Sequence, residues 1–283
     1  MRDQGKAARA PNGGAEPLTA DERKIVGVPR PHLSVVIPVH NEAENIVDLI
    51  EEITSALAGA VDFEIIVVDD GSSDDSAPRV RGAAESMAVL RLIRHARRRG
   101  QSAALLSGVR AARGPWIATL DGDGQNDPAD IPKLLAAFEG DADRESLLVT
   151  GRRVARRDTL LKRVSSRVAN AVRATVLGDG TPDTGCGLKV FPRAAFLAMP
   201  GFDHMHRFLP ALMQRGGGRV LSVPVNHRPR RGGITKYGLF DRLGVGIVDL
   251  LGVMWLNRRA PRPEIEADIA PETDASPGKE KDA

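Results

Sequence analysis

The sequence predicts an α/β fold in which a mostly parallel sheet is flanked by helices, with an amphipathic helix near the C-terminal end. Two observations support this class. Short apolar runs of strand length alternate with longer segments of helical periodicity, and polar or glycine residues follow each run. Such alternation is typical of βαβ units. The expected strands are 33–39, 63–70, 89–93, 116–123 and 147–151.

Helix signals follow the first and fourth of these strands. Asn41 is expected to cap a helix, with Glu44 completing a capping box and Ile46 beginning an apolar stripe. Asp127 and Pro128 should start a later helix. Beyond residue 151 the pattern is less regular, and we expect a basic helix at 160–176, a strand within 184–191, a helix at 206–214 and a strand at 219–225.

Composition suggests four segments. Hydrophobic residues make up 42% of the 283 residues, enough for a substantial core. Residues 1–31 and 260–283 lack an apolar period, and both are expected to be disordered tails, the second acidic and proline-rich. Residues 32–237 should form one folded domain and 238–259 an amphipathic segment. The C-terminal tail carries more acidic than basic side chains, so the rest of the chain is more positively charged than the net charge of +3 suggests. This positive charge favours phosphate-rich partners.

Cysteine content and hydropathy exclude several classes. Cys186 is the single cysteine, so neither an intramolecular disulfide nor a cysteine-based zinc site can form. The N-terminal residues show no secretory signal. The most apolar stretch, 239–256, is interrupted by Asp241, Arg242 and Asp249, so no spanning helix is expected.

An acidic motif ends the fourth expected strand. Asp121 and Asp123 are separated by one glycine and followed by Gly124 and Gln125. Ligands of open α/β sheets lie beyond the carboxyl ends of the strands, and Mg²⁺ or Mn²⁺ takes oxygen ligands. We therefore expect Asp121, Asp123 and Gln125 to hold Mg²⁺ or Mn²⁺, with a diphosphate supplying further oxygens.

Three other motifs or structures share some of these residues. An EF-hand loop would need glycine where Asn126 stands and glutamate where Pro132 stands. An aspartyl-phosphatase motif belongs on a first strand, not a fourth. A solvated acidic turn that caps a helix stays open as the structural alternative. The first strand is followed by no glycine-rich GxGxxG, which disfavours dinucleotide binding.

The motifs VVIPVHNEAENI, EIIVVDDGSSDDS, GQSAALLSGVRAARG and ATLDGDGQNDPADIPKLL resemble family 2 glycosyltransferases with the GT-A fold. The later motifs TGCGLKVFPRAAF, HRFLPAL and VPVNHRPRRGGITKYGLFDR resemble the polyprenyl-phosphate glycosyltransferases, typified by dolichyl-phosphate mannosyltransferase. The resemblance implies inverting transfer of one sugar from a GDP-mannose-like or UDP-sugar donor. It implies catalytic roles for Asp123 and Asp183, and a nucleotide border formed by Pro38, Asn41, Glu42, Asp70, Gly71 and Gln101.

Cations after the fifth strand indicate a phosphate acceptor. A lipid phosphate is already ionised, so it needs charge neutralisation rather than a general base. The expected phosphate contacts are Arg152, Arg167, Arg207 and Lys236. Arg97–Arg99 replaces an asparagine common in relatives, and its charge could favour an acidic sugar. The alternatives are a sugar-hydroxyl acceptor, or a non-catalytic basic module that binds membrane or nucleic acid. Few aromatic residues (4%) argue against nucleic acid.

The segment 239–256 predicts membrane attachment. Its low polarity, with Trp255 near its end and Arg258 and Arg259 beyond, is typical of a helix lying at a membrane interface. A buried core helix is the alternative. We expect a peripheral protein on the cytoplasmic face of the membrane, with a separate membrane protein or a second copy of the chain as a possible partner.

Overall fold

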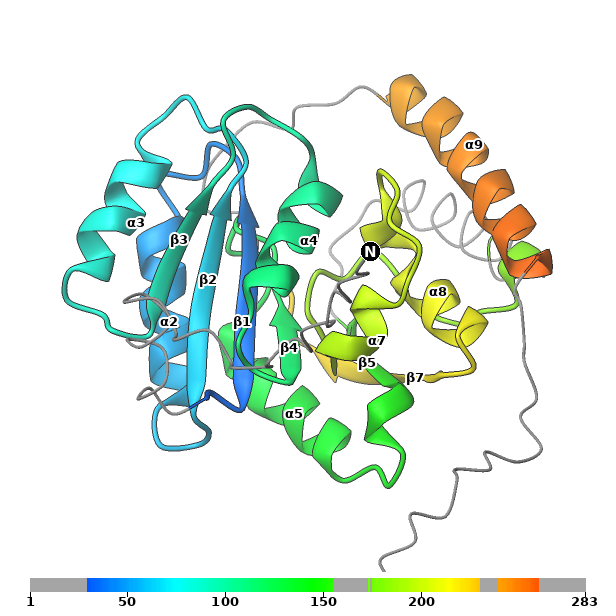
Figure 1. Cartoon of the computed structure of the whole chain (residues 1–283), viewed down its shortest axis with the longest axis horizontal. Coiled ribbons are helices and arrows are strands. Elements are labelled where there is room, and N and C mark those ends of the chain that lie inside the picture. The colour runs from blue at the N-terminus through cyan, green and yellow to red at the C-terminus, as the bar shows by residue number, and fades with distance from the viewer. Residues whose placement is uncertain (1–29, 155–172, 174, 230–238, 260–283) are drawn as a thin grey trace, which may run out of the picture.

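The computed structural model describes residues 30–154, 173, 175–229 and 239–259, and is built on a seven-stranded sheet (Figure 1). The strand order is β3-β2-β1-β4-β6-β5-β7. The predicted strand positions are confirmed, with shifts at their ends. The strands are β1 (Leu33–Val39), β2 (Phe63–Asp69), β3 (Leu90–Arg94), β4 (Trp116–Thr119), β5 (Leu147–Arg153), β6 (Lys189–Pro192) and β7 (Arg219–Val225).

Strand direction decides which loops meet. Strands β1 to β4 are parallel to one another, and β5 is parallel to β7. Strand β6 lies between β4 and β5 and is antiparallel to both. The segment that precedes β6 therefore reaches the same edge of the sheet as the segments that follow β4 and β5.

Helices cover both faces of the sheet (Figure 1). One apolar core lies against α2, α3 and α5, with Ile50 and Phe138 fully buried. The second lies against α4, α7 and α8, and Val253 of α9 joins it. The helices are α2 (Ile46–Leu57), α3 (Ser76–Ala84), α4 (Gln101–Ala111), α5 (Ile131–Glu139), α7 (Arg193–Leu197), α8 (Leu209–Arg215) and α9 (Leu239–Arg258), with 3-10 turns η1 (Pro128–Asp130), η2 (Arg144–Ser146) and η3 (Met205–Arg207).

The predicted capping box at Asn41 is wrong. Helix α2 begins at Ile46, and Asn45 is its N-cap residue. Asn41 instead adopts a left-handed backbone with φ 56°, and its N–H donates to the Ser72 hydroxyl at 2.9 Å. Asparagine tolerates this conformation better than most residues. Asn41 thus joins the loop after β1 to the loop after β2 instead of capping helix α2.

Several expectations fall on residues that the structure does not describe. These are most of both tails, most of the basic helix at 160–176, Arg167 and Lys236. Helix α9 falls within the predicted segment 238–259. None of the helices in the described part of the chain combines enough length and apolarity to cross a membrane.

Two helical glycines offer a matched test of packing. A Cβ on Gly108 of α4 would lie 2.3 Å from Cγ1 of Val36 in β1, whereas a Cβ on Gly82 of α3 would meet nothing within 4 Å. Gly108→Ala should therefore lower the free energy of unfolding by about 1–3 kcal/mol through overpacking. Gly82→Ala should raise it by about 0.5–1 kcal/mol through backbone entropy. Urea denaturation measures both, and equal effects would contradict the close packing of α4 on β1.

Candidate active site

The acidic motif lies where β4 ends. One oxygen of Asp121 accepts a hydrogen bond from the Gln101 side chain at 2.8 Å. The Asp121 carboxylate also lies against Gly187, where an added Cβ would be 2.3 Å from Oδ2. Asp123 accepts the backbone N–H of Gln125 at 3.2 Å. Gln101 and Gly187 therefore both hold the first carboxylate of the motif in place.

Electrostatics favour a cation beside Asp121. Burial and the nearby charge of Asp123 raise the pKa of Asp121, while Lys189, Gln101 and Arg153 act in the opposite direction. Within the described ranges, no group of three or more His, Cys, Asp or Glu side chains could hold a metal ion alone. Two carboxylates do fit Mg²⁺ or Mn²⁺ when the oxygens of a bound diphosphate complete the coordination. The ligand role of Gln125 stays a prediction.

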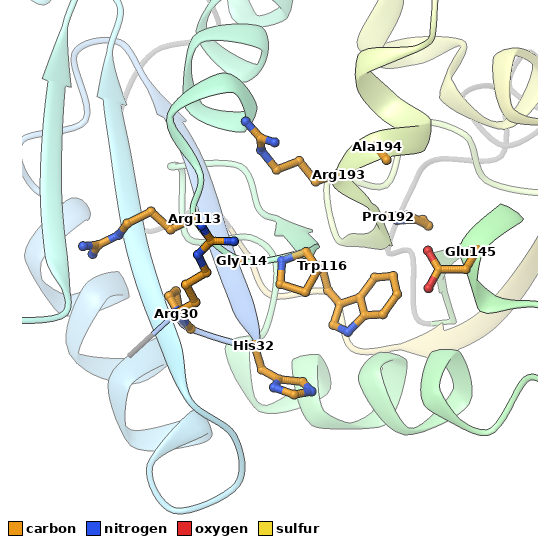
Figure 2. A pocket seen from close by; sticks show the side chains of 11 residues that line it. Arg30, His32, Arg113, Gly114, Trp116, Glu145, Pro192, Arg193 and Ala194 are labelled. Atoms are coloured by element: carbon orange, nitrogen blue, oxygen red, sulfur yellow. The ribbon is translucent and has the colours of Figure 1, made fainter. Parts of the chain in front are cut away.

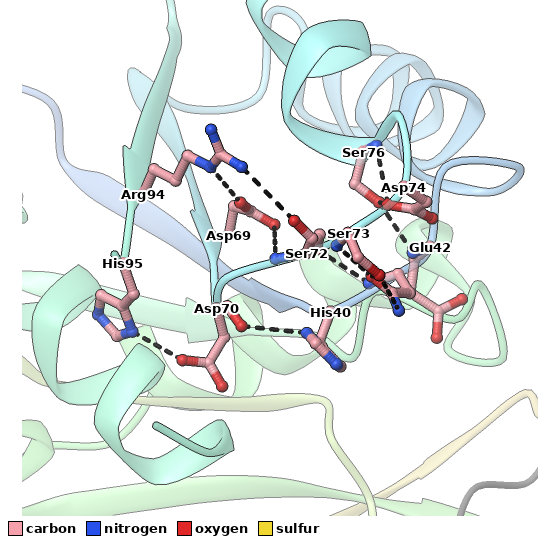
Figure 3. Close-up of polar contacts among 11 residues, drawn as sticks. His40, Glu42, Asp69, Asp70, Ser72, Ser73, Asp74, Ser76, Arg94 and His95 are labelled. Carbon is pink, nitrogen blue, oxygen red and sulfur yellow. Dashed lines mark hydrogen bonds and ion pairs between the residues drawn. The ribbon is translucent and has the colours of Figure 1, made fainter. Parts of the chain in front are cut away.

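The predicted nucleotide border is built from two strand-end loops that bind each other (Figure 3). The hydroxyl of Ser76 accepts the N–H of Glu42 at 2.9 Å, and Asn41 accepts the N–H of Ser73 at 2.8 Å. His40 Nδ1 lies 3.0 Å from the Asp70 carbonyl. The loops after β1 and β2 thus form one rigid rim, and Pro38 to Glu42 lie along it.

Asp70 anchors the loop after β3. Its carboxylate accepts the N–H groups of Arg99 and Gly100 at 2.8 and 2.7 Å, and His95 Nδ1 at 2.7 Å. Gly71 has φ 66°, and a Cβ there would lie 2.6 Å from the Arg98 nitrogen. Asp70 and Gly71 thus hold the 97–100 loop against the end of β2, and their role at a nucleotide border stays a prediction.

Asp183 forms an ion pair with Arg153. Nε and Nη2 of Arg153 each lie 2.7 Å from an Asp183 oxygen, and the Arg153 N–H donates to the same carboxylate at 3.2 Å. Both side chains are largely buried, and although burial opposes it, the ion pair raises the pKa of Arg153. Asp183 is therefore held as a charged partner of Arg153 at the edge where Asp121 lies.

Sequence reasoning missed Lys189 and His206, and it counted Arg153 only as one of several cations after the fifth strand. Arg153 follows Arg152 on β5, and alternation along a strand sends one of the two side chains toward the site, which the sequence alone left ambiguous. Lys189 begins β6, is 4% exposed, and donates to the carbonyls of Thr184 and Cys186. Burial lowers the pKa of Lys189, and the charge of Asp121 opposes that shift.

The other predicted phosphate contacts are less fixed. Arg152 is exposed, and Arg207 is exposed at the end of η3. Arg167 and Lys236 lie outside the described residues. Arg228, which follows β7, forms ion pairs with Glu52 and Asp127 and so stabilises the fold.

A separate pocket lies at the opposite edge of the sheet (Figure 2). Its volume is about 530 Å³, and its lining includes Arg30, His32, Arg113, Trp116 and Arg193. These residues stand before β1 and β4 or around the end of β6, away from the carboxyl ends of the parallel strands. The pocket therefore does not adjoin the acidic motif.

The comparisons with known proteins agree with this arrangement. A sequence model described as "Glycosyl transferase family 2" matches residues 34–198. The chain belongs to this family. It is 37% identical over 237 residues to the dodecaprenyl-phosphate galacturonate synthase of Rhizobium johnstonii, covering 82% of this chain and 69% of that protein. It is 38% identical to the undecaprenyl-phosphate 4-deoxy-4-formamido-L-arabinose transferase of Enterobacter sp., covering 75% and 64%. The chain thus spans about two thirds of the length of these relatives.

Solved structures confirm the predicted GT-A fold of this glycosyltransferase. Glucosyl-3-phosphoglycerate synthase from Mycobacterium tuberculosis, in complex with Mn²⁺ and UDP-glucose, superposes with a TM-score of 0.60 at 20% identity. The match covers 88% of this chain and 86% of that structure. The predicted membership of family 2 and the resemblance to polyprenyl-phosphate sugar transferases are also confirmed.

We expect the stability of the glycosyltransferase to depend on pH through His206. Its Nδ1 lies 2.8 Å from the Ser102 hydroxyl, and burial, with Arg207 adding, lowers its pKa from 6.5 to about 3. The folded state therefore favours the neutral ring. The stability that neutral His206 contributes is complete above pH 6.5 and is lost as the pH falls toward 3.

As the pH falls from 6.5 to 4.5, protonation of His206 in the unfolded state should lower the free energy of unfolding by about 1 kcal/mol per pH unit. His206→Gln keeps a hydrogen-bonding side chain but cannot titrate, so its stability should depend less on pH. Urea unfolding of both proteins across this range measures the difference, and parallel curves would show that His206 is not the source.

Proposed function

We propose that the protein transfers a single sugar from a nucleoside-diphosphate sugar to a polyprenyl phosphate, with inversion at the anomeric carbon. The observation that carries this proposal is the meeting of two kinds of group at one sheet edge. Asp121 and Asp123 suit a cation bound by a diphosphate, and the Arg153–Asp183 pair suits a phosphate monoester. The names of the curated relatives support the polyprenyl-phosphate acceptor.

The donor lies along the rim formed by the loops after β1 and β2. Pro38, Asn41, Glu42 and Gly71 border the nucleotide, and Gln101 orients Asp121. When bound, Mg²⁺ or Mn²⁺ supplies charge stabilisation for the departing nucleoside diphosphate. Catalysis then depends on Asp121 and Asp123 keeping the diphosphate in place and on the rim keeping the sugar carbon in line with the acceptor.

The acceptor phosphate needs cations and no general base, since it is already ionised. Arg153 offers a guanidinium fixed by Asp183, and Arg207 a second, exposed one. Asp183 then has a positioning role within the reaction centre. A sugar-hydroxyl acceptor would need a free carboxylate as base, and the ion pair of Asp183 with Arg153 disfavours it for that task.

A transfer assay tests this function. The protein is incubated with a polyprenyl phosphate, Mg²⁺ or Mn²⁺, and a panel of UDP- and GDP-sugars that includes a uronate, and the lipid product is identified by mass spectrometry. Asp123→Asn should lower turnover at least 100-fold, because one hard ligand is lost. Asp62→Asn, a change at an exposed acid before β2, serves as control. Near-normal turnover of folded Asp123→Asn would sink the metal assignment.

Helix α9 attaches the enzyme peripherally to the cytoplasmic face of a membrane in this proposal. Its Val253 is buried against the core, while Ile247, Val248, Leu251 and Trp255 are 53%, 69%, 52% and 59% exposed. Helix α9 therefore packs on the core through one face and exposes apolar side chains on another. This pattern fits a helix that binds a membrane interface better than it fits a fully buried core helix. A membrane protein partner or a second copy of the chain remains an alternative cover for this row.

The exposed row can be changed without touching Val253. Leu251→Ser with Trp255→Ser should weaken binding to anionic phospholipid vesicles at least tenfold, because apolar burial is lost. High salt should release a smaller share of the unchanged protein, since only the charge attraction is screened. Flotation measures both, with circular dichroism as the folding control. Undiminished flotation of the folded double variant would exclude α9 as the anchor.

A further inference from the structure

Lys189 is a buried ammonium that the proposed chemistry does not yet use. It is 4% exposed at the start of β6, and the hydrogen bonds it donates go to the main-chain carbonyls of Thr184 and Cys186. Removing an ammonium from water costs several kcal/mol, and neutral carbonyls offset only part of it. An apolar side chain of similar size would suit a purely structural role at this position better.

The loop that Lys189 holds is the one that supports the first carboxylate of the acidic motif. Gly187 packs so closely on Asp121 that a Cβ would be 2.3 Å from Oδ2. The Thr119 hydroxyl at the end of β4 donates to the Gly187 carbonyl at 2.7 Å. Carbonyls on both sides of Gly185 thus point to one ammonium, while Gly187 supports Asp121.

The same loop begins at Asp183. Its carbonyl accepts the N–H of Cys186 at 3.4 Å, and its carboxylate binds Arg153. The charges of Asp121 and Asp183 both attract Lys189. The buried ammonium of Lys189 therefore interacts both with Asp121, the proposed metal ligand, and with Asp183 of the Arg153–Asp183 pair.

We propose that Lys189 is a positioning residue that holds the 184–187 loop so that Asp121 is oriented for a divalent cation and a nucleoside diphosphate. Lys189 itself touches neither. This inference rests on the proposed function, because it presumes that Asp121 is a metal ligand. It assigns to the start of β6 a task in ligand binding that is separate from the stability of the fold.

The test compares Lys189→Met with the unchanged protein. Mn²⁺ affinity is measured by electron paramagnetic resonance, with Mn²⁺ alone and with Mn²⁺ plus UDP or GDP. We expect Lys189→Met to weaken nucleotide-dependent Mn²⁺ binding at least tenfold, while the midpoint of urea unfolding stays equal or rises. Lys189→Arg keeps the charge and should recover part of the affinity. Lys133→Met is the control, because Lys133 of α5 also donates to a carbonyl, that of Pro224, at 2.5 Å.

The outcomes separate the two proposals. If Lys189→Met binds Mn²⁺ as the unchanged protein does while Asp123→Asn does not, the role of Lys189 is overturned and the metal site stands. If Asp123→Asn also binds normally, the proposed function fails at the metal site itself. If Lys189→Met does not fold, the Mn²⁺ affinity of Lys189→Gln is measured in the same way. Unfolding of both neutral variants would assign Lys189 to the core and overturn the inference.

Discussion

The reversed direction of β6 is the constraint on which the candidate site depends. Parallel strands bring to the carboxyl edge only the segments that follow them. Because β6 is antiparallel to β4 and β5, the segment before it reaches that edge as well. Gly187 and Lys189 thereby lie beside Asp121, although more than 60 residues separate them from it along the chain. With β6 parallel, the acidic motif would have lacked its supporting loop.

Charge compensation follows from this arrangement. Carboxylates and cations alternate at the edge: Asp121 lies near Lys189, and Asp183 binds Arg153. Burial and the charge of Asp123 still raise the pKa of Asp121, so an added cation beside these two carboxylates would stabilise their charged form. A preorganised site of this kind needs little rearrangement when charged ligands arrive.

Local signals in the sequence were sufficient for the strands and for the acidic motif, because apolar runs and strand-end carboxylates are short-range patterns. They failed at Asn41, where a hydroxyl from a different loop replaced the expected helix cap. They could not choose between Arg152 and Arg153, since that choice depends on which face of β5 meets Asp183. In the sequence, Lys189 is a single lysine within an apolar strand, and no local pattern distinguishes it. Its role depends on backbone carbonyls that only the folded loop places beside it.

The family match ends at residue 198, yet the sheet and the acidic motif continue to need the chain beyond it. Strand β7 pairs with the full length of β5. After β7, the Asn226 N–H donates to buried Asp130 at 2.6 Å, and the Arg228 N–H donates to the carbonyl of Gln125 at 2.9 Å. A version shortened to the matched region would leave β5 as an open edge and the Asp130 carboxylate without that donor. Residues as far as Arg228 therefore contribute contacts on which the sheet and the segment after the acidic motif depend.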